Sequence, residues 1–557
     1  MRLISTNSHT KTEVKQREGR RRASTEQVEK LIEEINLRWT SLIRSNLSIL
    51  DLLQDPKIPN GTSKPKLYVH TSGNDTVESI RNQLIQLNPS GEIDQINILK
   101  LPSDINSFPN LEDHGTLYLP FPYVVPGGRF QEMYAWDSFF IAIGLLRDNQ
   151  TRLARNMVDN YIYQIEHYGT ILNGNRTYYL TRSQLPLLTP LIKLILPTYD
   201  KYGYVERLMR PRSTISIGLL GPILLLPRGF LGSSTSSNTS LEIIILTGIP
   251  DYDISEYYDL NTDTLTPKFM DNDRAMRESG FDTSSRFGPF NSKILDFNPI
   301  CLNSLIYLME KDLSELYTLI DPSTARPPGS KIIHHNNKSK FWLNKSLKRK
   351  NYDYIEKTRK EYIFGTTFIP LWAGLSTLEH ATEVCKNGRS AEGSPHRQRS
   401  GDQWDKPYVW APLQFFAVDG LRRYGFDLIA DRIAANFNSM VLKTWLNTGH
   451  LWEKYNGVKR DQSVVLKFGY PTNEAGFGWT NAVFTHFYDQ LKSAGKVDDS
   501  LLLDGIPVPV GAGTEQISGM KPPTTGTLDN SISELVLKDL GIEDLEWVEI
   551  GVDHPPL

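Results

Sequence analysis

An aspartate between two arginines is the first candidate for chemistry in this chain. Residues 277–286, RESGFDTSSR, place Asp282 five positions after Arg277 and four positions before Arg286, among small hydroxyl residues. Carboxylates accept hydrogen bonds and guanidinium groups donate them, so this combination suits a ligand that is rich in hydroxyl groups. By itself the spacing is more typical of a surface salt bridge, and the other loops of the chain must decide between the two interpretations.

Further loops also combine ionisable groups with aromatic rings. They are residues 126–137 (PGGRFQEMYAWD), residues 173–186 (NGNRTYYLTRSQLP), residues 403–412 (QWDKPYVWAP), and the pair formed by residues 453–455 (EKY) and 471–481 (PTNEAGFGWTN). Aromatic faces pack against the C–H surface of a sugar ring, while a few placed polar groups fix its hydroxyls. One such loop is an ordinary structured turn, but their recurrence indicates a carbohydrate site.

The elements that must position these loops are mainly helices. Apolar residues recur at three- and four-residue steps, which is the period of an amphipathic helix. The predicted helices are residues 25–44 (with Ser24 or Thr25 as N-cap), 136–147, 150–167, 298–319, 352–364, 373–384, 412–424, 426–446 and 480–494. Residues 66–70, KLYVH, predict a short strand after a linker at residues 54–65. Sustained β alternation is scarce, so the pattern predicts an all-α bundle, solenoid or toroid, and the lack of a fixed repeat disfavours the solenoid.

The composition excludes several classes of protein. The chain has 557 residues and a net charge of −3, which gives no reason to expect nucleic acid or a membrane as a partner. The two cysteines, Cys301 and Cys385, are too few for a disulfide framework, and no Cys/His spacing predicts a zinc site. We therefore expect neither a metal nor a cofactor. The longest apolar run, residues 215–226, is too short to cross a bilayer.

The N-terminus is polar and basic. Residues 1–24 lack the apolar core of a secretory signal and end in a run of arginines followed by Ala23 and Ser24. We expect a disordered tail on a cytosolic protein. The tail is either simply solvated or regulatory, because an R-R-x-S sequence suits basophilic kinases and a phosphate on Ser24 would add strong negative charge. A regulatory kinase or a phosphosite-binding protein is therefore a predicted partner.

The loop sequences resemble the motifs of the trehalase family of glycoside hydrolases. PGGRFxExYxWDS and QWDxPxxWAP resemble its two signatures, RESGFDTSSR is similar to its acid-carrying motif, and EAGFGWTN is similar to its base-carrying EGFGWTN motif. The stretch DRAMRESGFDTS and the upstream RRAS are most similar to the fungal-type neutral, cytosolic branch. The resemblance runs from about residue 66 to residue 494.

This resemblance implies an all-α (α/α)6 toroid that hydrolyses α,α-trehalose to two glucose molecules with inversion. Asp282 matches the family's general acid and Glu474 its general base. The positions that match sugar-contacting residues are Arg129, Trp136, Asp137, Asn173, Arg182, Ser183, Gln184, Arg277 and Gly280. The expected organisation is a disordered basic regulatory tail at residues 1–24, an N-terminal helix and linker at 25–65, and the catalytic toroid at 66–557.

The chemistry of inversion agrees with these residue types. An inverting glycosidase holds a protonated and an ionised carboxyl ~6.5–9.5 Å apart, which leaves room for one water molecule. We expect burial and neighbouring carboxylates to keep Asp282 protonated while Glu474 stays charged. The nearby arginines would favour ionised Asp282, so we expect them to be engaged elsewhere in the free enzyme.

The chain departs from the family pattern in particular places. Residues 214–246 stand where the family has a sugar-binding glutamate, Ala475 adds a residue between Glu474 and GFGW, Val409 replaces a glycine, and no acidic calcium-binding loop precedes the toroid. Residues 214–246 and 386–401 predict no element. A small shift of a base can cost on the order of 10²-fold in rate. Two alternatives therefore stay open: a catalytically impaired trehalase-like protein that binds a sugar or a protein partner, and a toroidal glycosidase for another α-glucoside.

Overall fold

The computed structural model describes most of the chain between residues 21 and 506. The described residues are 21–57, 64–72, 75–104, 107–108, 113–199, 257–259, 261–288, 292–320, 352–353, 355–359, 364–387, 401–466, 469–470 and 472–506. The chain divides into two units, residues 1–510 and 511–557, and every described residue belongs to the first unit. The irregular tract at 214–246 and residues 388–400 lie outside the described residues.

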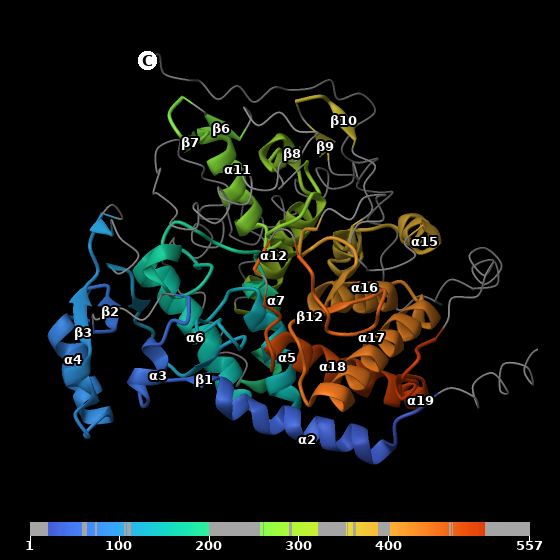
Figure 1. Ribbon diagram of the computed structural model, residues 1–557, viewed down its shortest axis with the longest axis horizontal. Coiled ribbons are helices and arrows are strands. Elements are labelled where there is room, and N and C mark those ends of the chain that lie inside the picture. Colours follow the sequence, from blue (N-terminus) through green and yellow to red (C-terminus); the bar gives the residue numbers. More distant parts are fainter. Residues whose placement is uncertain are drawn as a thin grey trace, which may run out of the picture. The chain divides into compact units, whose positions relative to one another are not determined.

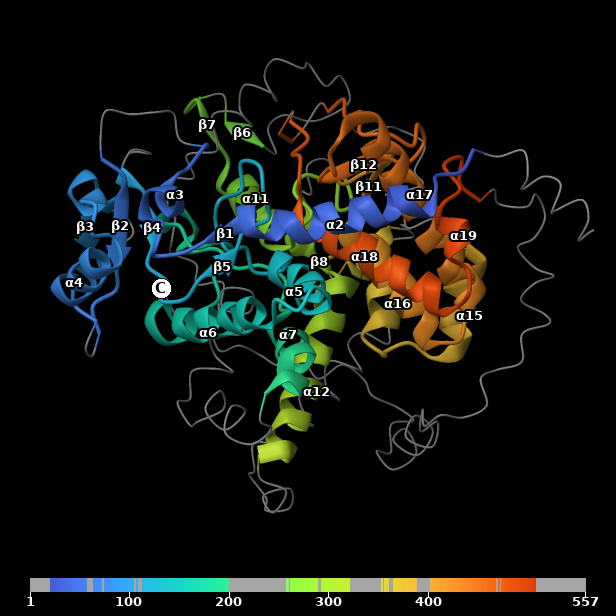
Figure 2. The same cartoon turned by 90° about the horizontal axis from the view of Figure 1, so that it is seen from below.

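Long helices form the body of the first unit (Figure 1). Their bounds are α5 Asp137–Arg147, α6 Thr151–Tyr168, α7 Leu188–Ile195, α11 Pro267–Glu278, α12 Ile300–Ile320, α14 Ile369–Trp372, α15 Leu378–Asn387, α16 Ala411–Arg423, α17 Asp427–Thr448, α18 Gly478–Ser493 and α19 Val497–Ser500. Helix α5 packs on α18, α16 packs on α14, α17 and α18, and α12 packs on α7 and α14. Figures 1 and 2 both show α5 beside α18.

The burial pattern separates central helices from outer ones. Helix α5 buries residues on almost every side, including Phe139, Phe140, Ile141 and Leu145. A helix that is apolar all round belongs in the middle of a core. Helix α6 instead alternates a buried face with an exposed face, as an outer helix does. The core therefore lies around α5, α16 and α18.

The N-terminal helix α2, Thr25–Leu42, packs on this core. Ser24 is its N-cap and forms a capping box with Gln27, as the sequence predicts. Its buried residues are Val28, Leu31, Ile35, Trp39 and Leu42. The helix contacts α17 and α18, along which it lies in Figures 1 and 2, and the Trp39 indole donates a hydrogen bond to Asp148 Oδ2 at 2.7 Å.

Short strands connect the helices. After α2, β1 (Ile43–Arg44) pairs antiparallel with β5 (Tyr123–Val124), and α3 spans Ile49–Leu53. A parallel sheet places β2 (Lys66–Val69) between β3 (Asn97–Lys100) and β4 (Thr116–Leu117), next to α4 (Val77–Leu87). The remaining pairings are antiparallel: β6 Tyr258–Asp259 with β7 Thr264–Leu265; β8 Phe297–Asn298 with β9 Tyr352–Asp353 and β9 with β10 Thr358–Arg359; β11 Tyr408–Trp410 with β12 Lys454–Asn456. Short 3-10 turns occur at Glu92–Gln95, Thr177–Tyr179, Leu196–Thr198, Ile294–Asp296 and Gly365–Phe368.

Most of the predicted elements are confirmed within a few residues, but two are not. The predicted helix at 352–364 is wrong, because Tyr352–Asp353 and Thr358–Arg359 pair as the antiparallel strands β9 and β10. Asp353 Oδ1 accepts the backbone N–H groups of Ile355 and Glu356, which stabilises a turn. The predicted helix at 373–384 starts too early: α14 ends at Trp372, Gly374 then adopts a left-handed φ of 71°, and the next helix, α15, begins at Leu378.

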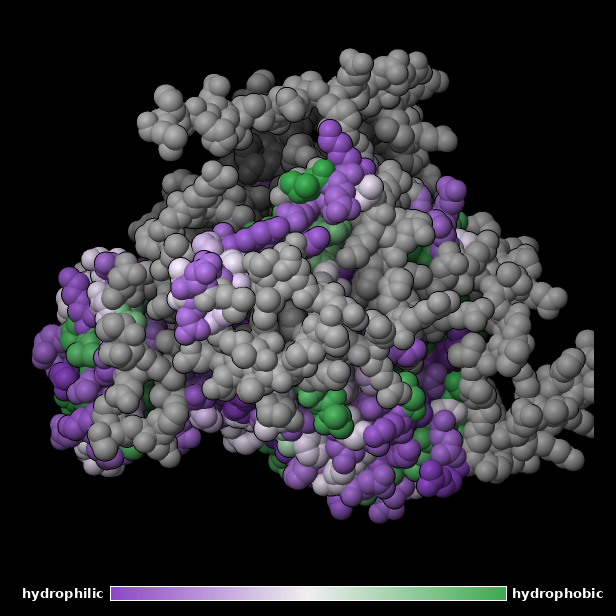
Figure 3. Space-filling model, turned by 45° about the horizontal axis from the view of Figure 1, so that its top comes forward, coloured by the Kyte–Doolittle hydropathy of each residue, from purple (hydrophilic) through white to green (hydrophobic). Residues whose placement is uncertain are grey.

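The surface is of mixed polarity where the structure describes it. On the face drawn in Figure 3, hydrophobic side chains of described residues lie in small groups among hydrophilic ones. Among the described residues, no helix combines the length and the hydropathy that a membrane crossing requires.

Candidate active site

One cavity collects side chains from all of the candidate loops. It has a volume of about 120 Å³. The residues that line it are Pro126, Phe130, Tyr134, Trp136, Asp137, Asn173, Tyr179, Arg182, Gln184, Arg277, Gly280, Asp282, Gln403, Trp404, Trp410, Glu453, Tyr470, Phe477 and Trp479. Aromatic rings with a few carboxyl, amide and guanidinium groups are the lining that a sugar site needs.

The end of helix α11 directs Asp282 into this cavity. Gly280 follows the helix with a left-handed φ of 77°, which only glycine adopts without cost, and this turn carries Phe281 into the core and Asp282 toward the cavity. Arg277 in the last turn of α11 donates to both oxygens of Asp273, at 2.9 and 3.0 Å. Its guanidinium lies farther from Asp282, with 3.7 Å between Arg277 Nη1 and Asp282 Oδ2.

These contacts explain the protonation state of Asp282. Burial raises the pKa of Asp282, while the guanidinium groups of Arg277 and Arg182 act in the opposite direction and Asp273 adds to the increase. The side chain keeps 36% of its surface exposed, on the cavity side, so the shift is smaller than in a sealed interior. Because Arg277 is occupied by Asp273, the net change still favours the protonated acid.

The loop of the second signature, residues 403–412, holds the acid loop, residues 277–286, in place. The Gln403 side-chain amide donates to the carbonyl of Asp282, and the Trp404 backbone N–H donates to the Thr283 carbonyl at 3.1 Å. Asp405 Oδ2 accepts the backbone N–H of Ser285 at 2.9 Å. The acid loop is thus hydrogen-bonded to residues more than one hundred positions later in the chain.

Tryptophan rings form one wall of the cavity. The rings of Trp404 and Trp410 stack with centroids 3.9 Å apart, and Trp136 and Trp479 pack edge-on or tilted around them. The Trp410 and Trp479 indole N–H groups donate to backbone carbonyls at 2.9 Å. Because these two N–H groups are already satisfied within the protein, Trp410 and Trp479 offer ring surface rather than donors.

Glu453 is a second acidic group in the lining. It precedes strand β12, whose pairing with β11 places Lys454 opposite Trp410. Its carboxylate pairs with Lys454 Nζ at 2.9 Å and accepts the Tyr470 hydroxyl, and only 1% of the side chain is exposed. Burial raises the pKa of Glu453, whereas Lys454 and the Tyr470 hydrogen bond favour its ionised form.

Asp137 faces the same region from the first turn of α5. Burial, and then the negative charge of Glu453, raise the pKa of Asp137 well above its ordinary value. Two neighbouring carboxyl groups in a buried site resist simultaneous ionisation. Burial and the charge of Glu453 therefore favour the protonated form of Asp137, while the Lys454 ammonium favours charge on Glu453.

Glu474 lies beside the cavity and is outside its lining. Its carboxylate accepts the Arg129 backbone N–H at 3.1 Å and the Thr472 hydroxyl at 2.8 Å. A Cβ at Gly128 would overlap this carboxylate, so the Gly-Gly turn of the first signature is what admits Glu474. Arg129 is likewise outside the lining, with its guanidinium 5.4 Å from the Tyr470 ring centroid.

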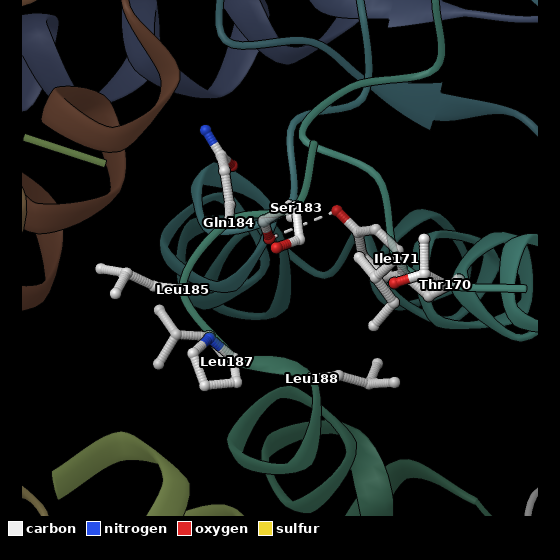
Figure 4. A pocket seen from close by; sticks show the side chains of 10 residues that line it. Thr170, Ile171, Ser183, Gln184, Leu185, Leu187 and Leu188 are labelled. Carbon is white, nitrogen blue, oxygen red and sulfur yellow. Dashed lines mark hydrogen bonds between the residues drawn. The ribbon is translucent and has the colours of Figure 1, made fainter. Parts of the chain in front are cut away.

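The other predicted sugar contacts divide between two cavities. Trp136, Asp137, Asn173, Arg182, Gln184, Arg277 and Gly280 line the large cavity. Ser183 lines a smaller neighbouring cavity with Thr170 and Leu188, and its buried hydroxyl has no hydrogen-bond partner among the described residues. Figure 4 shows the Gln184 side chain extending away from Leu187 and Leu188. Gln184 Oε1 accepts the Trp136 backbone N–H at 3.1 Å, which joins the two loops.

The prediction of site residues missed Glu453 and a set of aromatic residues. Tyr134, Tyr179 and Tyr470 line the cavity, and the Tyr134 and Tyr179 hydroxyls lie 3.0 Å apart. Most of these residues belong to the loops that the sequence singles out, so the recurrence of aromatics beside acids was the available signal. Tyr470 precedes the last motif by one residue and carried no signal of its own. Within the described residues, no cluster of His, Cys, Asp and Glu side chains has the arrangement of a metal site.

Comparisons with known proteins agree with this geometry. A family model described as Trehalase matches residues 11–210 and 253–492. A periplasmic trehalase of Xanthomonas campestris pv. campestris (strain B100) is 31% identical over 430 residues, which cover 71% of this chain and 73% of the relative. A cytosolic neutral trehalase of Kluyveromyces lactis is 30% identical over 526 residues, or 80% of this chain and 69% of the relative.

A solved structure shows the same fold. The neutral trehalase Nth1 from Saccharomyces cerevisiae superimposes with a TM-score of 0.65 at 26% identity, over 89% of this chain and 98% of that chain. This likeness and the helical body confirm the predicted all-α (α/α)6 toroid. The family model spans both signature motifs and the acid loop. The chain belongs to the trehalase family of glycoside hydrolases.

Proposed function

We propose that this protein is an α,α-trehalase that hydrolyses trehalose to two glucose molecules with inversion. The observation that carries the proposal is the convergence of Asp282 and Glu453 on one cavity lined by tryptophans and tyrosines. Membership of the trehalase family supports the choice of substrate. A disaccharide that fills such a cavity brings its glycosidic oxygen between carboxyl groups from two different loops.

Asp282 is the proposed general acid. In the reaction, a carboxylate removes a proton from water, and the water oxygen forms a bond to the anomeric carbon of one glucose unit. The bond between that carbon and the glycosidic oxygen breaks, and its electron pair stays on the oxygen, which takes the proton of Asp282. The raised pKa of Asp282 suits this role, because the acid must be protonated when the bond breaks.

We propose Glu453 as the general base. The sequence resemblance instead predicted Glu474 for this role. Glu453 supports the role because it lines the cavity, and Lys454 favours its ionised form. Glu474 supports it less, because it lies outside the lining of the cavity. Both carboxylates influence the Tyr470 hydroxyl, so they lie in one electrostatic neighbourhood.

Three conservative substitutions test the roles. We expect Asp282→Asn and Glu453→Gln each to lower kcat by ~10³-fold or more with an unchanged melting temperature, and Glu474→Gln to have a smaller effect. Glucose release from trehalose, followed in a coupled assay, provides the measurement. A larger loss of kcat in Glu474→Gln than in Glu453→Gln would indicate that Glu474 is the general base. Near-wild-type rates in Asp282→Asn would refute Asp282 as the general acid.

Binding measurements separate the enzyme from a catalytically impaired relative. The impaired protein would bind trehalose in a calorimeter without releasing glucose. A panel of α-glucosides in the same assay identifies a different substrate. We expect release of glucose from trehalose in preference to the other disaccharides, since the family match covers the residues on both sides of the cavity.

Location in the cytosol and control through Ser24 stay proposals. The relatives include cytosolic neutral trehalases and periplasmic ones, so a fractionation experiment must decide between compartments. Ser24 is exposed, but the residues before it are engaged: Ala23 N–H donates to the Leu501 carbonyl at 2.9 Å and Arg21 pairs with Asp504 at 3.1 Å. A kinase would have to release this segment. Phosphopeptide mapping after kinase treatment tests the site, and an unmodified Ser24 would refute it.

A further inference from the structure

Lys57 occupies a cage of oxygen atoms behind the candidate active site. Its ammonium group donates to the Arg129 carbonyl at 3.2 Å and to both carboxylate oxygens of Glu132 at 2.9 Å, and it lies 3.0 Å from Asp55 Oδ1. Only 15% of the side chain is exposed. The pKa of Lys57 is raised despite the opposing effect of burial, because Glu132 and Asp55 favour its charged form.

Arg176 completes a balanced cluster of two cations and two anions. Its Nε donates to Glu132 Oε1 at 2.8 Å and lies 3.7 Å from Asp55 Oδ2. Its other nitrogens donate to the carbonyls of Leu53 and Gln54. The pKa of Glu132 is lowered to about 2, since Lys57 and Arg176 outweigh the effect of its complete burial.

This cluster joins the segment after α3 to both loops that carry sugar-contacting residues. Arg129 and Glu132 belong to the 126–137 loop, in which Phe130 and Tyr134 line the cavity. Arg176 belongs to the 173–186 loop, in which Asn173 and Arg182 line it. The Ala135 N–H donates to the Asn173 carbonyl at 3.2 Å, so the two loops are also joined directly.

Lys57 is the member of the cluster that acts on the backbone of the first loop. It donates to the Arg129 carbonyl, while the N–H of the same residue donates to Glu474. The backbone of Arg129 is therefore held at its carbonyl by Lys57 and at its N–H by Glu474. We propose that Lys57 is a positioning residue: it sets the 126–137 loop in the geometry that binds trehalose. This proposal rests on the proposed trehalase function.

Removal of the ammonium group should weaken sugar binding more than the chemical step. Lys57→Ala removes the ammonium donor to the Arg129 carbonyl, leaves Glu132 with Arg176, and opens a space that propylammonium fits. We expect KM for trehalose to rise by ~10-fold or more with a smaller change in kcat, since a displaced loop misplaces the bound sugar. Propylammonium should restore KM, and tetramethylammonium, which has no N–H donor, should not.

Two further variants complete the experiment. Lys64→Ala is the matched control, because Lys64 is an exposed lysine that donates to the Asp94 carbonyl; we expect wild-type KM. Lys57→Met keeps the apolar stem if Lys57→Ala fails to fold, and it should show the same rise in KM. Unchanged KM in a folded Lys57 variant, or a defect in Lys57→Ala that propylammonium leaves in place, overturns the proposal. Failure of both Lys57 variants to fold also overturns it, in favour of a purely structural role.

A binding experiment distinguishes failure of the positioning role of Lys57 from failure of the proposed trehalase function. The dissociation constant for trehalose is measured by calorimetry in wild type and in Lys57→Ala, each also in the Asp282→Asn background. If wild type binds trehalose without releasing glucose, the proposed function fails, and weaker binding by Lys57→Ala still supports the positioning role. If wild type does not bind trehalose, both proposals are refuted.

Discussion

At the scale of single residues, neighbours decide which carboxyl groups carry protons. Asp282 and Glu132 both lie near an arginine, yet the effect of burial on the pKa dominates for Asp282 while two cations dominate for Glu132. The difference comes from the arginines' other partners. Arg277 is bound by Asp273, whereas Arg176 gives Glu132 a direct contact of 2.8 Å. The residue type therefore fixes the available chemistry, and the contacts select the protonation state.

The pH dependence of activity follows from this arrangement. An acid that must be protonated gives activity that is present below its pKa and lost as pH rises through it. Asp273→Asn removes a negative charge that raises the pKa of Asp282 and releases Arg277 toward it. We therefore expect the alkaline limb of the kcat/KM profile to move to lower pH in this variant.

A second aspartate on the same helix provides the control. Asp271 in α11 is exposed, so Asp271→Asn should leave the alkaline limb where it is in wild type. The measurement is kcat/KM for trehalose between pH 4 and 9. A limb that stays fixed in Asp273→Asn, or that moves to higher pH, would contradict the assignment of that limb to Asp282.

Arg286 shows that two arginines in one motif can have unrelated roles. It is fully buried, and its guanidinium lies 4.8 Å from the Phe281 ring centroid and 4.5 Å from that of Phe287. Its Nη1 donates to Cys301 Sγ and Thr366 Oγ1, at 3.3 and 3.4 Å. Cation–π contacts of this kind stabilise the acid loop, residues 277–286, from within the core. Arg286 is thus part of the core, while Arg277 faces the cavity.

At the scale of elements, close approach between helices depends on small residues. A Cβ at Gly144 of α5 would lie 2.6 Å from Trp39 Cζ2 and 3.0 Å from the Ala482 Cβ of α18. The glycine therefore allows α2, α5 and α18 to meet. This packing supports the active site, because α5 begins at Asp137 and α18 begins next to Phe477 and Trp479.

Gly144→Ala tests this junction. Alanine improves intrinsic helix propensity by ~1 kcal/mol, but overpacking a full core costs ~1–3 kcal/mol. We expect a net decrease in the free energy of unfolding, measured by urea denaturation. Trp39→Phe removes the clashing ring atoms, so Gly144→Ala should cost less in that background. Equal costs in the two backgrounds would contradict the proposed contact.

At the scale of the whole molecule, the N-terminal segment is part of the same body as the toroid. Helix α2 buries Leu31, Ile35 and Trp39 against it, and Lys57 reaches the active-site loops. Full burial of one large apolar side chain is worth ~1.5–3 kcal/mol, and a domain has a net stability of ~5–15 kcal/mol. The buried face of α2 alone is therefore comparable to the whole stability of a domain.

Deletion of residues 1–57 should prevent cooperative folding. The truncated chain would expose the surface that α2 covers and leave Glu132 with Arg176 as its remaining described cation. We expect no cooperative thermal transition by circular dichroism and no glucose release. A variant that begins at residue 21 keeps every contact of the described N-terminal segment, and it should melt as the full chain does. A cooperative transition in the larger deletion would refute this integral role.

The sequence by itself determined the features that depend on local pattern. Apolar periodicity located α2, α5, α6, α12, α16, α17 and α18, because apolar residues recur at three- to four-residue steps along these segments. It failed at residues 352–364, where the Asp353 turn outweighs a weak helical pattern. The acid motif could also be recognised in the sequence, because Arg277, Gly280 and Asp282 lie within one short segment.

Only the tertiary structure decided which carboxylate faces the cavity. Glu453 and Glu474 both stand in aromatic loops, and the motif resemblance of residues 474–481 pointed to Glu474. Pairing of β12 with β11 sets Glu453 beside the tryptophan wall, and a hydrogen bond from Arg129, 345 positions earlier, holds Glu474 behind the Gly-Gly turn. The cage around Lys57 has the same origin. Such contacts depend on where distant segments meet, which local sequence pattern does not encode.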